Sequence, residues 1–296
     1  MEIVFLGTSG MQPTKDRGLM SIYINHGAEN ILVDCGEGTQ RQMRIADLKP
    51  TKIQRIFLTH LHTDHILGIL GMFYNLEANQ YPGVIEVYGP RGLKKMLSGI
   101  VREEFFKGKL RVKLNEIKEG TIYEGKELIA TAVKLEHCVL CYGYSFEERE
   151  KRKMDLKYLA KFGLKQDPVL GKLQKGEDII WKGKKIKARL ATKVVKGKKL
   201  SVVLDTIYCK NAVKLASNSD LLISESTFMD KDADKAKEYM HLTSSDAGRI
   251  AKESGAKKLI LTHFSQRYKD TKDMLSEAKK VFKNTSVSED FMKVSV

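Results

Sequence analysis

The chain has 296 residues, 42% of them hydrophobic, and a mean hydropathy of −0.32. This length and composition suffice for a sizeable core in one large α/β domain, or in one domain with an insertion. No apolar run approaches the roughly 20 residues that a bilayer-spanning helix needs, which argues against a membrane protein. A strand-like run begins at the first residues without a basic leader or cleavage site, so we expect a cytoplasmic protein.

The net charge of +15 is concentrated in one segment. Residues 149–199 contain 18 Lys/Arg and 5 Asp/Glu, whereas the rest of the chain is nearly neutral. A basic segment in a near-neutral body indicates a polyanionic partner such as nucleic acid. The alternative is a lysine-rich solvated surface, as in proteins from hot environments. Charge alone favours nucleic acid.

Strands and helices are expected along most of the chain. The patterns predict strands at residues 3–6, 21–25, 30–33, 53–59, 84–88, 111–117, 121–123, 129–136, 142–146, 200–204, 221–224 and 258–262. They predict helices at residues 39–46, 93–100, 212–216, 245–254 and 272–283. We expect a single domain over residues 1–296, with residues 149–190 inserted as a basic arm.

Four strong metal-binding side chains, His60, His62, Asp64 and His65, lie within six positions directly after the predicted buried strand 53–59. Extended backbone would turn the first three to one side, whereas His65 would approach from another direction at the start of a helix. Three ligands from one side and one offset suit two adjacent metal ions. The alternative, a polar loop with hydrogen-bonded histidines, is the weaker interpretation of such a cluster.

Further candidate ligands, His137, Asp205 and His263, lie at or just after the ends of other predicted strands, where loops of α/β folds converge. Imidazole and carboxylate ligands suit zinc, with manganese and iron as alternatives. We assign His60, His62 and His137 to one ion, Asp64, His65 and His263 to a second, and Asp205 to both. Two such ions can share a hydroxide and polarise a phosphoryl oxygen, which is the chemistry of phosphodiester hydrolysis.

The sequence also contains candidates for proton transfer, and one histidine that is assigned no chemical role. Asp64 is a candidate proton acceptor, and Glu225 with His241 is a candidate pair for protonating a leaving oxygen. Glu225 taken alone would more often be a surface or capping carboxylate. His26 lies in a predicted hairpin turn and is assigned a structural or surface role.

Cysteine usage indicates a reducing compartment. Cys138 and Cys141 form a single C-x-x-C pair, which on its own suggests a redox pair or half a zinc site. No second pair exists, and the surrounding residues are apolar. We therefore expect free, buried thiols here.

The motifs resemble a known family. Residues 59–65 (THLHTDH) match the H-x-H-x-D-H signature of the metallo-β-lactamase superfamily. FLGT at 5–8, VDCGEGTQRQM at 33–43 and LTHFSQRY at 261–268 resemble tRNase Z, and the resemblance runs nearly end to end. It implies a four-layered αββα sandwich with an inserted arm. It also implies an endonuclease that removes the 3′ trailer of precursor tRNA after the discriminator nucleotide, leaving a tRNA 3′-hydroxyl and a 5′-phosphate trailer.

The resemblance also implies roles for particular residues. It supports the seven metal ligands, Asp64 as proton acceptor, and the Glu225–His241 pair. It implies a homodimer in which the arm of one subunit holds the tRNA that the other cleaves. Basic residues expected to contact tRNA phosphates are Lys151, Arg152, Lys153, Lys172 and Lys175.

The chain departs from the family pattern at several positions. Thr63 stands where glycine is usual, and residues 204–209 read LDTIYC, without the glycine, arginine and proline usual at Leu204, Ile207 and Tyr208. Residues 137–144 read HCVLCYGY in place of HSVPALGY. Two rival functions share the fold: a phosphodiesterase of small substrates, which would not need the basic arm, and a non-catalytic RNA-binding relative, which would be expected to lose ligands.

Overall fold

The computed structural model describes residues 1–101 and 110–296 and divides them into two units. The main unit comprises residues 1–146 and 199–296, and the smaller unit, here called the arm unit, comprises residues 147–198. The predicted basic arm at residues 149–190 falls within the arm unit. Among the described residues, no helix is both long enough and apolar enough to traverse a bilayer.

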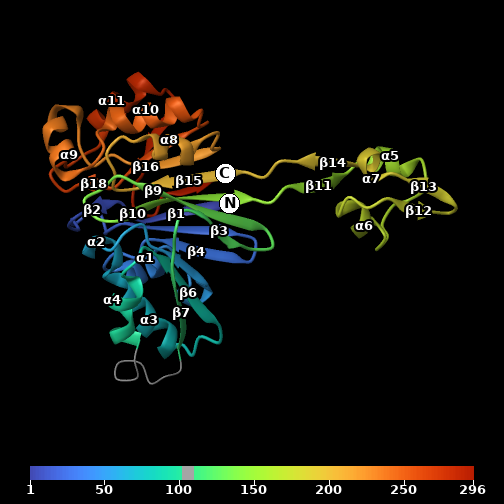
Figure 1. Ribbon diagram of the computed structural model, residues 1–296, viewed down its shortest axis with the longest axis horizontal. Coiled ribbons are helices and arrows are strands. Elements are labelled where there is room, and N and C mark those ends of the chain that lie inside the picture. The colour runs from blue at the N-terminus through green and yellow to red at the C-terminus, as the bar shows by residue number, and fades with distance from the viewer. Residues whose placement is uncertain (102–109) are drawn as a thin grey trace. The chain divides into compact units, whose positions relative to one another are not determined.

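The first of two seven-stranded sheets in the main unit has the order β20-β1-β3-β4-β5-β6-β7 (Figure 1). Strands β4 to β7 run parallel to one another, so their C-terminal ends meet at one edge. The bounds are β1 Glu2–Gly7, β3 Ser21–His26, β4 Glu29–Val33, β5 Arg55–Phe57, β6 Val84–Gly89, β7 Arg111–Glu116 and β20 Lys293–Ser295.

The second sheet has the order β19-β17-β16-β15-β10-β9-β8, and β15, β16, β17 and β19 are parallel. The bounds are β8 Gly120–Glu124, β9 Leu128–Leu135, β10 Cys141–Glu148, β15 Lys199–Val203, β16 Leu221–Glu225, β17 Leu259–Thr262 and β19 Thr285–Val287. A short parallel pair, β2 Ser9–Gly10 with β18 Phe264–Ser265, joins a loop near the N-terminus to the segment after β17.

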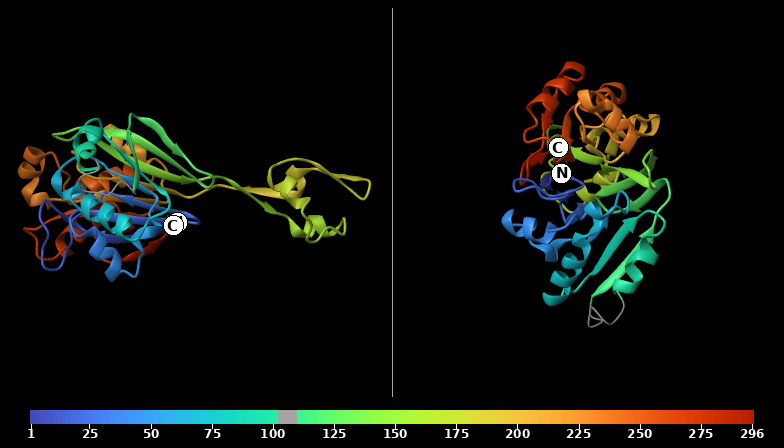
Figure 2. Two further views of the ribbon diagram at one scale, coloured as in Figure 1. Left: turned by 90° about the horizontal axis from the view of Figure 1, so that it is seen from below. Right: turned by 90° about the vertical axis from the view of Figure 1, so that its left-hand side faces the viewer.

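Helices cover the outer faces of both sheets (Figures 1 and 2). On the first sheet lie α1 Thr39–Ile45, α3 Gly68–Ala78 and α4 Leu93–Val101; on the second lie α8 Lys210–Ala216, α10 Ser244–Ser254 and α11 Lys272–Val281. The shorter elements are α2 Thr63–Ile66, α9 Ala233–Tyr239 and the 3-10 turns Pro50–Lys52 and Asp230–Asp232. The main unit therefore has the predicted αββα layers.

Three hydrophobic cores hold these layers together, one between the sheets and one under each helical layer. In the central core, the Phe57 ring lies edge-on to Tyr144 at 5.5 Å and to Phe146 at 5.3 Å between centroids. The Tyr144 hydroxyl donates to the Leu58 carbonyl at 2.5 Å, which satisfies its one buried polar atom. This packing fixes the end of β5, from which the H-x-H-x-D-H segment leaves.

The arm unit has a small core of its own. Strands β11 Lys151–Met154 and β14 Thr192–Val195 pair antiparallel, as do β12 Ile179–Trp181 and β13 Lys184–Ile186. The helices α5 Leu156–Ala160, α6 Leu170–Gln174 and α7 Ala188–Ala191 complete it. Its buried side chains include Leu159, Leu164, Leu173, Ile179 and Ile186. Apolar residues thus recur among the lysines closely enough to fold this segment.

Two local predictions are corrected by the structure. Extended backbone does not continue to Asp64, because α2 begins at Thr63, directly after His62. Cys138 is not buried: it lies exposed in a bend, whereas Cys141 is buried at the start of β10. The predicted stop of the helix at residues 245–254 is confirmed, since Gly255 caps α10 with a φ of 68°.

Candidate metal centre

The H-x-H-x-D-H segment and three strand ends of the main unit meet in one place. His60 and His62 follow β5, and His137, Asp205 and His263 follow β9, β15 and β17. Parallel strands end at a common edge, so the loops after them converge there. The seven predicted ligands form two groups whose ligand atoms lie within 4.8 Å of one another: His60, His62, His137 and Asp205 in one, and Asp64, His65 and His263 in the other.

Nitrogen atoms of the first group face one another. His60 Nε2 lies 2.9 Å from His62 Nδ1, and His137 Nε2 lies 3.4 Å from the same atom. Asp205 Oδ2 lies 3.7 Å from His60 Nε2. Separations of this size are those of donor atoms that share one ion at about 2.0–2.2 Å.

The second group is more deeply buried and shares Asp205. His65 Nε2 lies 3.2 Å from His263 Nε2 and 3.4 Å from Asp64 Oδ2. Asp205 Oδ1 lies 3.5 Å from His65 Nε2 and 3.4 Å from His263 Nε2. One carboxylate oxygen of Asp205 therefore faces each group, the arrangement that a bridging ligand needs.

Partners outside the groups orient the rings. The outward Nδ1 atom of His60 lies 3.0 Å from Thr59 Oγ1, and that of His263 lies 2.9 Å from Thr227 Oγ1. His137 Nδ1 lies 3.0 Å from the Met240 carbonyl, and His65 Nδ1 lies 2.7 Å from Asp34 Oδ2. Metal-binding histidines characteristically hold their second nitrogen in this way. In all four, Nε2 is left to face the centre.

A buried carboxylate oxygen and two unusual backbone conformations fit a site for divalent cations. Asp205 is 2% exposed, and its buried Oδ1 has no hydrogen-bond partner among residues 1–101 and 110–296. Asp205 and His263 also have positive φ values of 47° and 56°, which cost energy in residues other than glycine. An unpaired carboxylate oxygen held this way among imidazoles is costly unless a cation neutralises it.

Burial and neighbouring charges act in opposite directions on the pKa of His65, whereas burial and the charge of His65 act in the same direction on the pKa of His60. Burial would lower the pKa of His65, but Asp205 and Asp34 raise it well above its ordinary value. Burial lowers the pKa of His60 well below its ordinary value, and His65 adds to that effect. The buried carboxylates thus favour positive charge on His65, and the His60 imidazole is favoured in the neutral form that binds a metal.

Glu225 and His241 form an ion pair beside the centre. Glu225, at the end of β16, is fully buried, and both of its oxygens lie 3.1 Å from His241 Nδ1. Its Oε1 also accepts the Thr206 backbone N–H at 2.7 Å, and its Oε2 accepts the Thr227 hydroxyl at 2.5 Å. Burial would lower the pKa of His241, but Glu225 raises it to about 9. The imidazole is therefore protonated at neutral pH.

The start of α10 fixes the position of His241. Thr243 accepts the Asp246 backbone N–H at 3.2 Å, and the Asp246 carboxylate accepts the Thr243 N–H at 3.2 Å. This reciprocal capping box ends the preceding loop at a defined residue. His241, two residues earlier, also donates its backbone N–H to the Ala236 carbonyl at 2.8 Å.

Comparison with known proteins identifies the family. A family model described as the metallo-beta-lactamase superfamily matches residues 16–144. The whole chain aligns at 37% identity with ribonuclease Z of Methanothermobacter thermautotrophicus and at 38% with that of Archaeoglobus fulgidus, covering 97% of each. The chain belongs to the ribonuclease Z family.

A solved structure supports the same assignment for this ribonuclease Z. Human tRNase Z, short form, matches with a TM-score of 0.72 at 26% identity, over 100% of this chain and 99% of that one. YhfI of Bacillus subtilis, described as a metallo-beta-lactamase fold protein, matches with a TM-score of 0.73 at 20% identity and shares the fold. The predicted fold and family are confirmed.

The structure brings together most, but not all, of the predicted site residues. The seven candidate ligands, Glu225 and His241 lie together in the main unit. Lys151, Arg152, Lys153, Lys172 and Lys175 belong to the arm unit, where Arg152 is half-buried and donates to Thr192 Oγ1 at 3.2 Å. His26 lies at the end of β3, outside both ligand groups.

Sequence reasoning missed Asp34 and Thr227. Asp34 directly follows the predicted strand 30–33, and Thr227 lies two residues after Glu225. Asp34 could have been found from its position, because it follows a predicted strand in the same way as the candidate ligand Asp205. Neither residue would bind an ion itself; each contacts a histidine that does.

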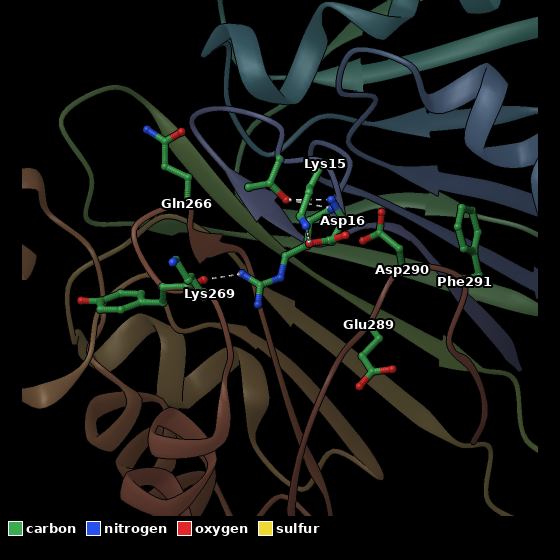
Figure 3. Close-up of a pocket in the computed structure, with 10 residues that line it drawn as sticks. Lys15, Asp16, Gln266, Lys269, Glu289, Asp290 and Phe291 are labelled. Carbon is green, nitrogen blue, oxygen red and sulfur yellow. Dashed lines mark hydrogen bonds and ion pairs between the residues drawn. The ribbon is translucent and has the colours of Figure 1, made fainter.

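The main unit also contains a cavity of about 730 Å³ (Figure 3). Its lining includes three cations, Lys15, Arg17 and Lys269, and three carboxylates. None of the seven ligands lines it. Its balanced charge gives no preference for an anionic or cationic ligand, so we assign it no part in the chemistry.

Proposed function

We propose that this ribonuclease Z cleaves precursor tRNA on the 3′ side of the discriminator nucleotide, releasing a tRNA 3′-hydroxyl and a 5′-phosphate trailer. The observation that carries the proposal is full-length similarity to ribonuclease Z proteins in a chain with both ligand groups. The rival readings, a small-substrate phosphodiesterase and a non-catalytic relative, have no comparable support.

His60, His62 and His137 would hold one metal ion, Asp64, His65 and His263 a second, and Asp205 both. Metal ions bound there would act as Lewis acids on a phosphoryl oxygen and lower the pKa of water. The imidazole and carboxylate donors are compatible with zinc, and manganese and iron remain alternatives. Zinc at two ions per subunit therefore stays a prediction.

Asp64 is suited to orient the attacking water and accept its proton. Its Oδ2 accepts the Met11 backbone N–H at 2.8 Å, which fixes the carboxylate. Burial would raise the pKa of Asp64, but hydrogen bonds with His263 and His65 hold it well below its ordinary range. The carboxylate is therefore ionised at neutral pH, so its oxygens can accept a hydrogen bond from the attacking water.

His241 is suited to protonate the departing 3′ oxygen. Glu225 occupies its Nδ1, so Nε2 is the nitrogen left to donate. A buried carboxylate behind the ring stabilises the imidazolium before transfer and fixes its direction. Such an acid typically contributes 10²–10⁴-fold to rate.

The arm unit is the proposed tRNA-binding surface. Lys151, Lys153, Lys172 and Lys175 are exposed there, and the segment carries most of the net charge of the chain. Lysine contacts to phosphate supply affinity without base specificity. A homodimer in which one arm serves the other active site remains a prediction, as does a cytoplasmic location.

The test is cleavage of a 3′-extended precursor tRNA by the wild type and by His65→Ala, with the product ends mapped. One cut after the discriminator nucleotide, lost in the variant, is the expected result. A small chromogenic phosphodiester serves as the comparison substrate. Turnover of the small substrate without cleavage of precursor tRNA would favour the first rival, and binding of tRNA without any cleavage would favour the second.

A further inference from the structure

Tyr239 is an exposed aromatic side chain near the proposed acid. It is the last residue of α9, two positions before His241 in the chain, and it is 52% exposed. We propose that the Tyr239 ring stacks on the base of the discriminator nucleotide while His241 protonates the 3′ oxygen of that same nucleotide. This inference rests on the proposed function, because it concerns the nucleotide that carries the departing oxygen.

A buried ring connects Tyr239 to the metal centre. Phe228 is only 3% exposed, and its ring centroid lies 6.3 Å from that of Tyr239, with 9° between the two ring planes. The Phe228 centroid also lies 6.0 Å from the centroid of the His241 ring. The His241 ring in turn lies 5.1 Å from that of His137 and 5.6 Å from that of His263. These separations are those of interacting rings, so one buried phenylalanine contacts both the exposed tyrosine and the proposed acid.

The buried ring behind Tyr239 is itself held in place. Phe228 donates its backbone N–H to the Leu242 carbonyl at 3.2 Å, and its carbonyl accepts the Ser244 N–H at 3.1 Å. The Arg267 guanidinium lies over the Phe228 ring, 4.9 Å from its centroid, in a cation–π contact. Tyr239 therefore has a fixed surface to lie against. A side chain positioned in this way loses less conformational freedom when a ligand binds to it.

Stacking suits recognition of one nucleotide position whatever its base. Aromatic side chains bind unpaired bases by stacking, and the contact tolerates any base because every base has a π-face. The base of the discriminator nucleotide is attached to the same ribose as the departing 3′ oxygen. A platform for that base must therefore lie close to the group that protonates the oxygen, and Tyr239 meets this requirement through its contact with Phe228 beside His241.

The first test combines substitutions at Tyr239 with a modified substrate. Tyr239→Ala is expected to lower kcat/KM for precursor tRNA by about 5- to 150-fold, the range for loss of one base–aromatic stack. On a precursor tRNA that lacks the discriminator base, the variant and the wild type should have equal kcat/KM. Tyr239→Phe should match the wild type on both substrates, because the ring remains. A loss in Tyr239→Ala that is equal on the two substrates would overturn the proposal.

Two controls separate this stack from other effects. Tyr74→Ala removes an exposed tyrosine of α3 that lies outside the ligand groups, and it should leave kcat/KM unchanged. A precursor tRNA that lacks the first base of the trailer should still show the full loss with Tyr239→Ala. If the loss disappears with this substrate instead, the ring binds the trailer and the proposal is wrong.

The second test needs no variant. Wild type should cut the substrate without the discriminator base about 5- to 150-fold less efficiently than intact precursor tRNA, and exchange among the four bases at this position should change kcat/KM by less. Equal cleavage of the intact substrate and the substrate without the base would remove this inference and leave the proposed function standing. A wild type that cuts neither substrate would overturn the proposed function, and this inference with it.

Discussion

Replacing Glu225 with glutamine should remove the charge that keeps His241 protonated. Glu225 raises the pKa of His241 to about 9, against an ordinary value of about 6.5. The raised pKa means that the proton is retained at neutral pH and is lost as the pH rises through about 9. If the variant returns His241 to its ordinary value, the protonated fraction at pH 7.5 falls from about 0.97 to about 0.09.

The expected result is a loss of about tenfold in the rate of the chemical step at pH 7.5, shrinking towards none near pH 5.5. The alkaline limb of the pH–rate profile should move down by about 2.5 units. Glutamine can still accept the Thr206 N–H that Glu225 Oε1 accepts at 2.7 Å, but its amide NH₂ would then face Thr227 Oγ1, so the metal content of the variant is measured before rates are compared. The assay is single-turnover cleavage of precursor tRNA, because multiple turnover can report product release.

Glu289→Gln is the matched control, since the same change is made at an exposed carboxylate outside the ligand groups. It should leave the profile unchanged. A Glu225→Gln profile that falls uniformly at every pH, with its alkaline limb in place, would refute the reasoning. That result would mean that Glu225 contributes position or structure and does not set the charge of His241.

Two further predictions concern Asp34, which contacts the outward nitrogen of His65, and the lysines of the arm unit. Asp34→Asn should weaken metal binding about 10–100-fold, measured by competition with a chromogenic chelator, because an amide NH₂ facing His65 Nδ1 cannot accept its proton. Asp290→Asn, at a carboxylate that accepts the Gly18 N–H, is the control, and equal affinity in both variants would exclude an orienting role for Asp34. Replacing Lys153, Lys172 and Lys175 with alanine should weaken tRNA binding and flatten its log–log salt slope by about 2–3, at ~0.7–0.9 per lost phosphate contact. The same change at the exposed Lys279 and Lys280 of α11 should have little effect, and an unaltered slope in the arm variant would contradict the arm assignment.

Sequence predicted the fold where local pattern and family motif agree. The alternation of burial from Leu128 to Val133 in β9 and the glycine that ends α10 both follow from local sequence rules. The pairing of Asp205 with both groups followed from strand ends converging at one edge. The helical turn that begins at Thr63, directly after His62, did not follow from the strand pattern.

The exposure of Cys138 could not be predicted from the residues next to it. Its neighbours Val139 and Leu140 are apolar, and this favoured a buried strand, yet they are 39% and 36% exposed. In the bend after β9, His137 contacts His62 and the Met240 carbonyl, which are remote in sequence.

Two threonines connect the buried carboxylates to the metal-facing histidines by the same device. Thr59 Oγ1 lies 2.9 Å from Asp34 Oδ2 and 3.0 Å from His60 Nδ1. Thr227 Oγ1 lies 2.5 Å from Glu225 Oε2 and 2.9 Å from His263 Nδ1. A hydroxyl has one proton, and an ionised carboxylate can only accept, so each threonine donates to the carboxylate.

Each threonine oxygen must then accept from the histidine, which places the ring proton on Nδ1 of His60 and His263. Nε2 is left with its lone pair toward the centre, as metal binding requires. Glu225 therefore acts in two directions: it stabilises the His241 imidazolium directly, and through Thr227 it fixes the tautomer of His263. One buried carboxylate at the end of β16 thus links the proposed acid to the second ligand group.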